Sequence, residues 1–341
     1  MNYVAGIDSG GTHTNIRILS PAGETDNREL DSSLSSSRTT EELEYTVDRI
    51  VTDLRSYAGD NALSVWISAA GYAPSSKQRF EDIVRAKSQV LNGHVGICND
   101  AVTLLLAHDP EVVVIIAGTG SVVMARTTSG EVLMRGGDEW VASDYGSAFW
   151  LGLSGIRSAY RAFEKVSADT ALCHQLIRHY RPFENPKTRE QQRSVISEIA
   201  RSLAGQGTDT KRQIASFAVS VSQEAEKGDS VAKGIIAEAA EELGGAAAKV
   251  YRELAMKESR RVVPPRFLLI GSVAFYSRFY LEAVKASLDK NLSEVRAKIG
   301  EPLQVDLQLN GVDEALALAQ MLADGVEPSH LDAQHPYSVC R

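Results

Sequence analysis

Cysteine is scarce in this chain: Cys98, Cys173 and Cys340 are the only three among 341 residues, and they form no CxxC pair. Structural zinc sites and disulfide frameworks both need cysteines at short, repeated spacings. The sequence therefore disfavours both kinds of site. It predicts free thiols in a reducing compartment, so we expect a cytoplasmic protein.

Long apolar runs and basic runs are also missing. The longest apolar stretch, Val112 to Ala117, is far shorter than the ~20 residues that a membrane-spanning helix needs. The chain begins Met1-Asn2-Tyr3, without the basic start and apolar core of a signal peptide. Its formal charge is −8, from 36 Lys and Arg against 44 Asp and Glu. We therefore expect neither a nucleic acid nor a membrane as a partner.

The composition is that of a packed chain, with 43% hydrophobic and 23% charged residues, and the length corresponds to about two domains. Short β-prone runs alternate with single helices in the first half, whereas residues 147–258 are almost wholly helical. The expected strands are residues 3–7, 15–19, 63–70, 95–98, 112–117, 122–126, 268–270 and 305–309. The expected helices include residues 40–57, 101–107, 214–225, 231–254, 279–288 and 311–322.

The chain carries a short internal repeat. From Val112 onward it repeats the order of its N-terminus: a strand, a loop rich in Gly, Ser and Thr, a return strand and a glycine turn. Loop 1 is Asp8-Ser9-Gly10-Gly11-Thr12-His13-Thr14, and loop 2 is Gly118-Thr119-Gly120-Ser121. The repeat suggests two halves of similar build, each presenting one glycine-rich hairpin.

Each loop can offer backbone N–H groups to an anion, because glycines leave the backbone unobstructed. Hydroxyls of Thr12 and Thr14, or of Thr119 and Ser121, would add donors. Asp8, at the mouth of loop 1, could hold Mg²⁺ directly or through water. One such loop is usually only a turn, but two of the same layout favour nucleotide binding. The chain contains neither GxxxxGK[ST] nor a GxGxxG after a strand, so a P-loop or Rossmann site is disfavoured.

Three further segments carry polar residues at element boundaries. Asn99-Asp100 follows a strand and starts a helix, where Asp100 is either a cap or a base for a substrate hydroxyl. Asp144 either caps the next long helix or binds sugar hydroxyls, with Trp140 or Tyr145 as an apolar face for the sugar ring. Gly271-Ser272 is either a tight turn or a close approach to an adenosine.

Six segments resemble motifs of one protein family. Residues 6–12 and 115–121 resemble the two phosphate loops of the N-acetylglucosamine kinase-like, BadF/BadG-type branch of the actin-fold sugar kinases and ATPases. Asn99-Asp100-Ala101 is similar to the segment that holds the family's catalytic aspartate. Residues 143–152 resemble its GDEGSGxWLG motif, residues 269–273 its adenosine motif and residues 311–319 its closing helix. The segments keep the family's order over nearly the whole chain, so the resemblance is specific for the fold.

The resemblance implies an α/β fold of two duplicated actin-like (ribonuclease H-like) domains around a hinged cleft. The first domain would be residues 1–105, with a closing helix at about 312–325 packed back on it. The second would be residues 106–311, with a large helical insertion at 150–258. Residues 326–341 would form a loosely held tail. We also expect a homodimer, with the apolar stripe Ile235, Ala239 and Leu243 as either internal packing or the dimer face.

The resemblance further implies an ATP-dependent, Mg²⁺-dependent kinase acting on a small amino sugar. Asp100 would deprotonate the sugar 6-hydroxyl for attack on the γ-phosphorus. Phosphate contacts would come from loop 1 with Asp8 and from loop 2. His13 would either contact phosphate or be a solvated side chain. Contacts to the adenosine would come from Gly271 and Ser272. The residues that would bind the sugar are Asn99, Asp100, Gly137, Asp138, Glu139 and Asp144.

The chain departs from the family pattern near the expected sugar. Asp138 and Glu139 stand where the family has Trp and Gly, and Tyr145 replaces a Glu. We expect Asp138 or Glu139 to lie near the sugar 2-position and to favour glucosamine, with its protonated amine, over N-acetylglucosamine. Two alternatives remain: an ATPase activator of a dehydratase, which would need cluster-binding cysteines, and a sugar-sensing module without turnover.

Overall fold

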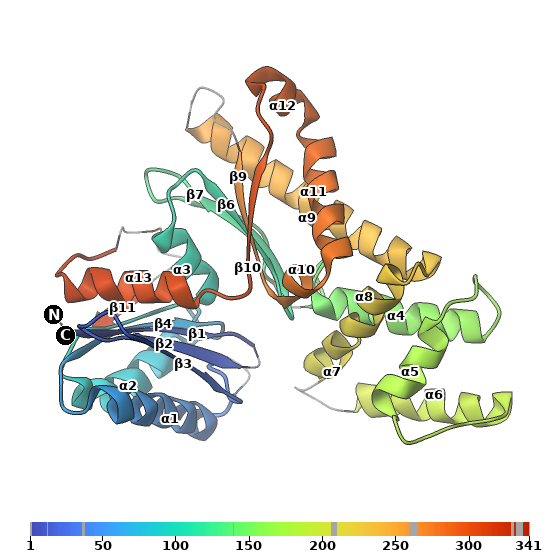
Figure 1. Cartoon of the computed structure of the whole chain (residues 1–341), viewed down its shortest axis with the longest axis horizontal. Coiled ribbons are helices and arrows are strands. Elements are labelled where there is room, and N and C mark those ends of the chain that lie inside the picture. Colours follow the sequence, from blue (N-terminus) through green and yellow to red (C-terminus); the bar gives the residue numbers. More distant parts are fainter. Residues whose placement is uncertain are drawn as a thin grey trace. The chain divides into compact units, whose positions relative to one another are not determined.

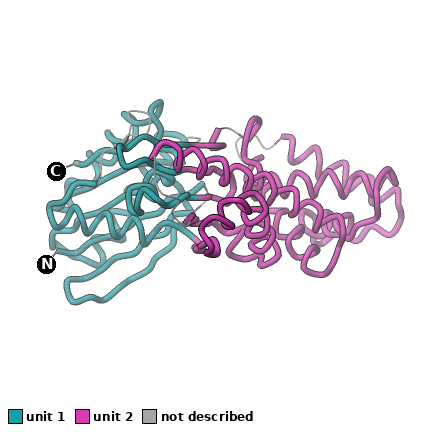
Figure 2. The backbone as a smooth tube through the Cα atoms, turned by 90° about the horizontal axis from the view of Figure 1, so that it is seen from above, with its two compact units in different colours: residues 1–114, 125–133, 310–341 teal, residues 115–124, 134–309 magenta. Residues whose placement is uncertain are grey.

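The computed structural model describes residues 2–11, 13–35, 38–138, 140–205, 210–258, 265–328, 331 and 337–340. The chain divides into two compact units (Figure 2). Unit 1 comprises residues 1–114, 125–133 and 310–341, and unit 2 comprises residues 115–124 and 134–309. Each unit is built on one mixed sheet with helices.

Unit 1 contains a six-stranded sheet in the order β11-β5-β4-β1-β2-β3. Its strands are β1 (Tyr3–Ser9), β2 (Thr14–Leu19), β3 (Thr25–Leu30), β4 (Leu63–Ala69), β5 (Val95–Cys98) and β11 (Tyr337–Cys340). β1, β4 and β5 run parallel, whereas β2, β3 and β11 pair antiparallel with their neighbours. The carboxyl ends of the three parallel strands therefore lie along one edge of this sheet.

The helices of unit 1 cover both faces of its sheet (Figure 1). They are α1 (Thr40–Ala58), α2 (Lys77–Ser88), the 3₁₀ turn η1 (Gln89–Leu91), α3 (Asp100–Ala107) and α13 (Val312–Ala323). α1 and α2 lie on one face and enclose a core with Ile7, Ile16 and Leu43, while α3 and α13 lie on the other with Trp66 and Leu318. These apolar faces are buried on both sides, which is the main stabilisation of such a layer.

The second sheet, most of which lies in unit 2, has five strands in the order β10-β9-β6-β7-β8. Its strands are β6 (Val112–Ala117), β7 (Ser121–Arg126), β8 (Val132–Gly136), β9 (Arg266–Ile270) and β10 (Gln304–Gln308). The helices of unit 2 are α4 (Ala148–Phe163), α5 (Leu172–Tyr180), α6 (Arg189–Ala204), α7 (Thr210–Ser216), α8 (Ala218–Glu226), α9 (Ser230–Lys257), α10 (Ser272–Tyr276), α11 (Arg278–Asn291) and α12 (Ser293–Ile299). No helix within the described ranges is both long enough and apolar enough to cross a membrane.

Several expected elements are confirmed, and α1 begins with a capping box formed by Thr39 and Glu42. The apolar stripe Ile235, Ala239 and Leu243 of α9 is buried inside unit 2, so it is internal packing and not a dimer face. The expected helix over residues 214–225 is instead divided into α7 and α8 at the buried Phe217.

The C-terminal segment differs from the loose tail that the sequence suggested. Residues 337–340 form β11, which pairs antiparallel with the edge strand β5. Tyr337 packs against Trp66 with ring centroids 5.8 Å apart, and the Ser338 hydroxyl hydrogen-bonds to Glu81. A side chain packed on the sheet and a ladder of backbone hydrogen bonds hold this strand in place. Residues 329, 330 and 332–336 of the expected tail lie outside the described residues.

Candidate functional site

Two carboxylates meet at the carboxyl edge of the unit 1 sheet. Asp8 lies near the end of β1, and Asp100 opens α3 directly after β5. In the strand register Asp8 is opposite Ser68 of β4, which in turn is opposite Cys98 of β5. Polar groups that follow parallel strands in this way collect at one edge of a sheet, where ligands commonly bind in α/β proteins.

The protonation of the two carboxyls is coupled. Burial, together with the negative charge of Asp100, raises the pKa of Asp8 to about 7, although the hydrogen bond from the Gly311 amide lowers it. Burial also raises the pKa of Asp100, against the lowering effect of the hydrogen bond that it accepts from the Ala101 amide. A perturbed pair of this kind at a sheet edge is typical of a functional site.

The sequence left open whether Asp100 caps α3 or acts as a base, and the structure shows that a neighbouring residue, Asn99, is the cap. Asn99 is the N-cap residue, and its Oδ1 accepts a hydrogen bond from the Ala101 amide at 3.0 Å. Asp100 is the first residue inside the helix, with Oδ1 at 2.9 Å from the same amide. Asn99 thus serves as the cap, and the cap interpretation is not required for Asp100.

Gly311 and Glu314 extend this cluster, and the sequence reasoning did not identify either residue as part of the site. The Gly311 amide donates to Asp8 Oδ2 at 3.1 Å. Glu314, which is 6% exposed, adds a smaller charge effect that also raises the pKa of Asp8. α13 reaches β1 because residue 6 is glycine: a Cβ there would lie 2.2 Å from the Leu316 amide nitrogen. Gly311 stands at the start of the closing helix that the sequence predicts. The sequence does not show that its amide contacts Asp8, because that contact depends on how the chain packs in three dimensions.

Loop 1 keeps two open glycines. An added Cβ at Gly10 or Gly11 would meet nothing within 4 Å, and the Gly10 amide donates to the His13 carbonyl oxygen at 3.1 Å. The Thr14 hydroxyl, an expected phosphate donor, is buried and donates to the Ser32 carbonyl oxygen at 2.7 Å. As the first residue of β2, Thr14 points its side chain into the protein, so the hydroxyl is used internally. Thr12 lies outside the described residues.

His13 faces acidic side chains. Its Nδ1 lies 3.3 Å from Asp31 and 3.7 Å from Glu29, and its side chain is half-exposed. The imidazole therefore has partners on the protein surface, in agreement with the solvated alternative. Its expected phosphate contact has no support in this geometry.

Loop 2 is held by hydrogen bonds to residues 144–149 of unit 2. The amides of Ala148 and Phe149, at the start of α4, donate to the carbonyl oxygens of Gly118 and Thr119 at 2.9 and 3.3 Å. The Ser121 hydroxyl donates to the Tyr145 carbonyl oxygen at 2.7 Å. These bonds fix the loop conformation and commit the Ser121 hydroxyl to the protein. The Gly118 amide also donates within the loop, to the Gly120 carbonyl oxygen at 3.0 Å.

Asp144 does not have the expected cap role, and its carboxylate lies against loop 2. It adopts a left-handed backbone with φ 67°, which Asp tolerates better than most residues. Its side chain is 4% exposed and lies 2.7 Å from Lys211 Nζ, and its Oδ1 accepts from the Ser121 amide at 2.9 Å. The N-cap of α4 is Ser147. Asp144 therefore supports loop 2 and does not cap the helix, and its carboxylate is already engaged within the protein.

The expected adenosine motif lies directly against loop 2. Gly271 follows β9 with φ 124°, and a Cβ there would lie 2.4 Å from the Ala117 carbonyl oxygen and 3.0 Å from the Gly118 nitrogen. Only glycine permits this approach. Unit 2 therefore brings together two segments, residues 118–121 and 271–272, that the sequence assigned to different parts of one nucleotide.

The segment around Asp138 is exposed. Gly137, which follows β8, has a left-handed backbone with φ 82°. Its amide donates to the carbonyl oxygen of Ser121, the first residue of β7, at 3.1 Å. The Asp138 side chain is exposed, and its carbonyl oxygen accepts from Ser143 Oγ at 2.7 Å. Trp140 is 40% exposed and packs on Phe149, with ring centroids 5.2 Å apart. Glu139 lies outside the described residues.

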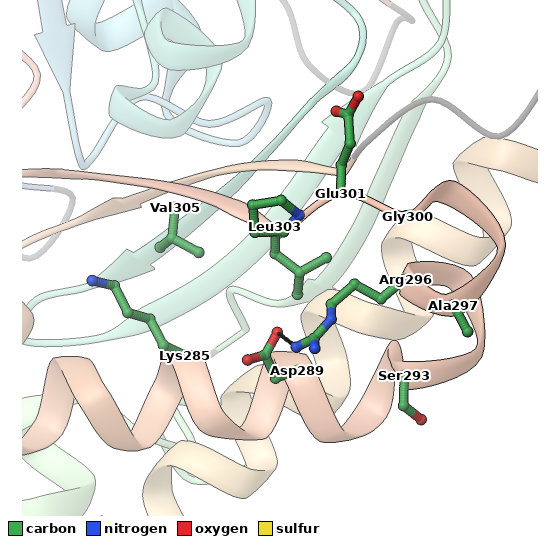
Figure 3. A pocket seen from close by; sticks show the side chains of 10 residues that line it. Lys285, Asp289, Ser293, Arg296, Ala297, Gly300, Glu301, Leu303 and Val305 are labelled. Atoms are coloured by element: carbon green, nitrogen blue, oxygen red, sulfur yellow. Dashed lines mark ion pairs between the residues drawn. The ribbon is translucent and has the colours of Figure 1, made fainter.

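Unit 2 also has a cavity of about 740 Å³ beside α11, α12 and β10 (Figure 3). Lys285 and Glu301 line it, together with an ion pair between Arg296 and Asp289 at 2.8 Å. None of the site residues expected from the sequence lines this cavity. We therefore base no function on it.

The fold of two mixed sheets with helices, with its glycine hairpin headed by Asp8, is similar to that of a solved sugar kinase. The chain belongs to the BadF/BadG/BcrA/BcrD ATPase family, whose model matches residues 5–333.

Individual relatives agree with this class. The chain is 28% identical over 292 residues to an N-acetylmuramic acid/N-acetylglucosamine kinase of Clostridium acetobutylicum, which covers 82% of this chain and 89% of the relative. Its fold is similar to that of a candidate N-acetylglucosamine kinase from Chromobacterium violaceum (TM-score 0.67, 19% identity, 94% and 99% of the two chains). It is also similar to a ROK family glucokinase from Streptomyces griseus solved with glucose and AMPPNP (TM-score 0.54, 18% identity, 95% and 100%).

Proposed function

We propose that the protein is an ATP-dependent amino-sugar kinase that phosphorylates the 6-hydroxyl of N-acetylglucosamine or glucosamine. The observation that carries the proposal is the coupled pair of carboxyls, Asp8 and Asp100, at the carboxyl edge of the unit 1 sheet. The family supports ATP as the nucleotide, and the Clostridium relative, which is named an N-acetylmuramic acid/N-acetylglucosamine kinase, supports the choice of acceptor.

In this proposal Asp100 is the general base. Its carboxylate takes the proton of the sugar hydroxyl, the sugar oxygen forms a bond to the γ-phosphorus, and the bond from that phosphorus to ADP breaks. A base whose pKa is raised by burial holds such a proton better than an exposed carboxylate would. Asn99, next to it, would contact the sugar through its amide nitrogen, because its Oδ1 caps α3.

The triphosphate would be held by backbone groups. We propose that the amides of Gly11 in loop 1 and of Thr119 and Gly120 in loop 2 donate to it. Gly10 and Gly118, whose amides donate to the His13 and Gly120 carbonyl oxygens, would leave room for it because they lack a side chain. The chain would consist of two duplicated actin-like domains, residues 1–105 and 106–311, each of which contains one of the two loops. The helical region 150–258 would be an insertion in the second domain, and α13 would close the first.

Asp8 fits the requirement for Mg²⁺. Among the described residues no three His, Cys, Asp or Glu side chains gather as a protein-only metal site would need. Magnesium bound with a nucleotide needs fewer, since it takes one or two carboxylates, phosphate oxygens and water. Asp8 would hold the ion directly or through water, and the bound ion would neutralise charge on the phosphate oxygens. A cation there would also offset the repulsion between Asp8 and Asp100.

A coupled assay of ADP release against a panel of sugars tests the proposal. Turnover that requires N-acetylglucosamine or glucosamine supports the kinase. ATP hydrolysis that no sugar stimulates would instead favour an ATPase activator, and sugar binding without ADP release would favour a sensing module. In the same assay, Asp138→Ala should change the ratio of kcat/KM for glucosamine over N-acetylglucosamine if Asp138 faces the 2-position.

The Asp100→Asn variant tests the base. We expect kcat to fall by about 10²–10⁴-fold, while the affinity for ADP measured by calorimetry changes little. Asp60→Asn, at an exposed turn of unit 1, is the matched control and should keep full activity. An Asp100→Asn enzyme that transfers phosphate as fast as the parent would remove the proposed mechanism.

A further inference from the structure

Lys211 reaches loop 2 through Asp144. Its Nζ lies 2.7 Å from Asp144 Oδ2, and the other carboxylate oxygen accepts a hydrogen bond from the Ser121 amide at 2.9 Å. The Asp144 side chain is 4% exposed and the Lys211 side chain 30%. The ion pair therefore connects the first turn of α7 to the backbone of the loop.

The helices behind this ion pair pack tightly on each other. Residue 152 of α4 is glycine, and a Cβ there would lie 2.0 Å from the Ile214 carbonyl oxygen of α7. The start of α4 also binds the carbonyl oxygens of Gly118 and Thr119. Lys211 thus projects from a helix that is fixed against the same helix that holds loop 2.

The charge of Asp144 would oppose anion binding if it were not compensated. Its carboxylate touches the loop itself, since a Cβ at Gly120 would lie 2.7 Å from Asp144 Oδ1. A carboxylate this close to a bound phosphate, and this poorly solvated, would repel it strongly. The ammonium group of Lys211 lies within ion-pair distance and neutralises that charge, so the loop keeps its support without a net negative charge.

We infer that Lys211 is a positioning residue for the nucleotide: it holds Asp144 against loop 2 and makes the carboxylate compatible with bound phosphate. The inference rests on the proposed function in that loop 2 is taken to bind phosphate. It does not depend on the phosphoryl acceptor. It also assigns Asp144 to the nucleotide and not to the sugar.

Calorimetric titration of the full-length protein with ADP and Mg²⁺, without sugar, tests the inference. Lys211→Met leaves a buried carboxylate unpaired, and we expect the affinity for ADP to fall by about tenfold or more. Lys211→Arg keeps the positive charge and should stay within about threefold of the parent. The double variant Lys211→Met/Asp144→Asn removes both charges and should recover most of the lost affinity.

Steady-state kinetics give a second readout. Lys211→Met should raise KM for ATP and leave KM for the sugar unchanged. Asp144→Asn removes the charge that Lys211 compensates, so Lys211→Met should lower the affinity for ADP much less in the Asp144→Asn background than in the parent. This background keeps the test open if Lys211→Met does not fold.

The matched control is Lys227→Met. Lys227 pairs at 2.8 Å with Glu224, whose side chain is 6% exposed, in the same unit but on α8 and the turn after it. It should reduce thermal stability as Lys211→Met does, and leave the affinity for ADP unchanged.

Three results would overturn the inference. One is unchanged binding of ADP by folded Lys211→Met. Another is a double variant that binds as weakly as Lys211→Met, which would make Lys211 a direct phosphate ligand. The third is an Asp144→Asn enzyme that loses sugar affinity and keeps ATP affinity. Failure of the proposed sugar kinase activity would appear separately, as ADP binding without sugar-dependent turnover.

Discussion

At the scale of single residues, the proposed chemistry depends on carboxylates whose surroundings disfavour their charge. Asp8 and Asp100 both have raised pKa values, first because of burial, and in Asp8 also because of the neighbouring carboxylate. Asp144, by contrast, is paired with a lysine. In the proposed mechanism Asp8 takes up a cation and Asp100 a proton, whereas the charge of Asp144 is neutralised by Lys211.

The raised pKa of Asp8 predicts a pH-dependent stability. An unfolded Asp ionises near 3.8 and the folded carboxyl near 7, so the native state binds more protons between these values. Stability contributed by this group is therefore present below pH ~4 and is lost as the pH rises to ~7, by an amount on the order of 1–3 kcal/mol. Urea unfolding of the parent without Mg²⁺ should show this loss between pH 4 and 7.

Asp8→Asn is the comparison for that slope. It has no proton to lose, so its stability should change less with pH over the same range, and it should be the more stable protein at pH 8. A parent and a variant with the same slope would show that Asp8 ionises normally in the folded state.

At the scale of elements, glycines decide how closely strands, loops and helices approach. Gly271 lets the turn after β9 lie on loop 2, and Gly6 lets α13 lie on β1. The sequence identified the loops themselves because glycine, serine and threonine after an apolar run form a local pattern. It did not reveal which distant backbone each glycine touches, since that contact depends on the packing of the whole unit.

Gly271→Ala tests this role. With φ 124° and a Cβ 2.4 Å from the Ala117 carbonyl oxygen, alanine must displace either the turn or loop 2. We expect a loss of about 2–4 kcal/mol in the free energy of unfolding, and weaker binding of ADP. Gly245→Ala is the control, because Gly245 lies within α9 and a Cβ there meets nothing within 4 Å. That change should stabilise the protein by up to about 1 kcal/mol.

Elements with weak sequence signals were the ones missed. β3 reads Thr-Asp-Asn-Arg-Glu-Leu, and its polar side chains hide a strand that is specified by pairing with β2. β11 comes from a polar tail and forms because β5 leaves an edge open to it. Strands such as β1 and β6, buried along most of their length, were predicted because their apolar residues are continuous.

At the scale of the molecule, the internal repeat predicted two halves, each with one loop. The proposal that both loops bind the same nucleotide leads to a measurement on the whole chain. Addition of ADP with Mg²⁺ should slow amide hydrogen exchange in residues 8–11 and in residues 118–121 together. Residues 181–188, a loop far along the chain in the helical region, serve as the internal control. Protection confined to one of the two loops would contradict a shared nucleotide.

The three tryptophans of the chain give it an optical reporter in each unit. Trp66 is fully buried in unit 1 under Tyr337, whereas Trp140 is 40% exposed in unit 2 beside the segment that follows β8. An aqueous quencher such as iodide should therefore reach the fluorescence of Trp140 and spare that of Trp66. A sugar that settles against Trp140 would shield it, so emission spectra could follow ligand arrival without any label.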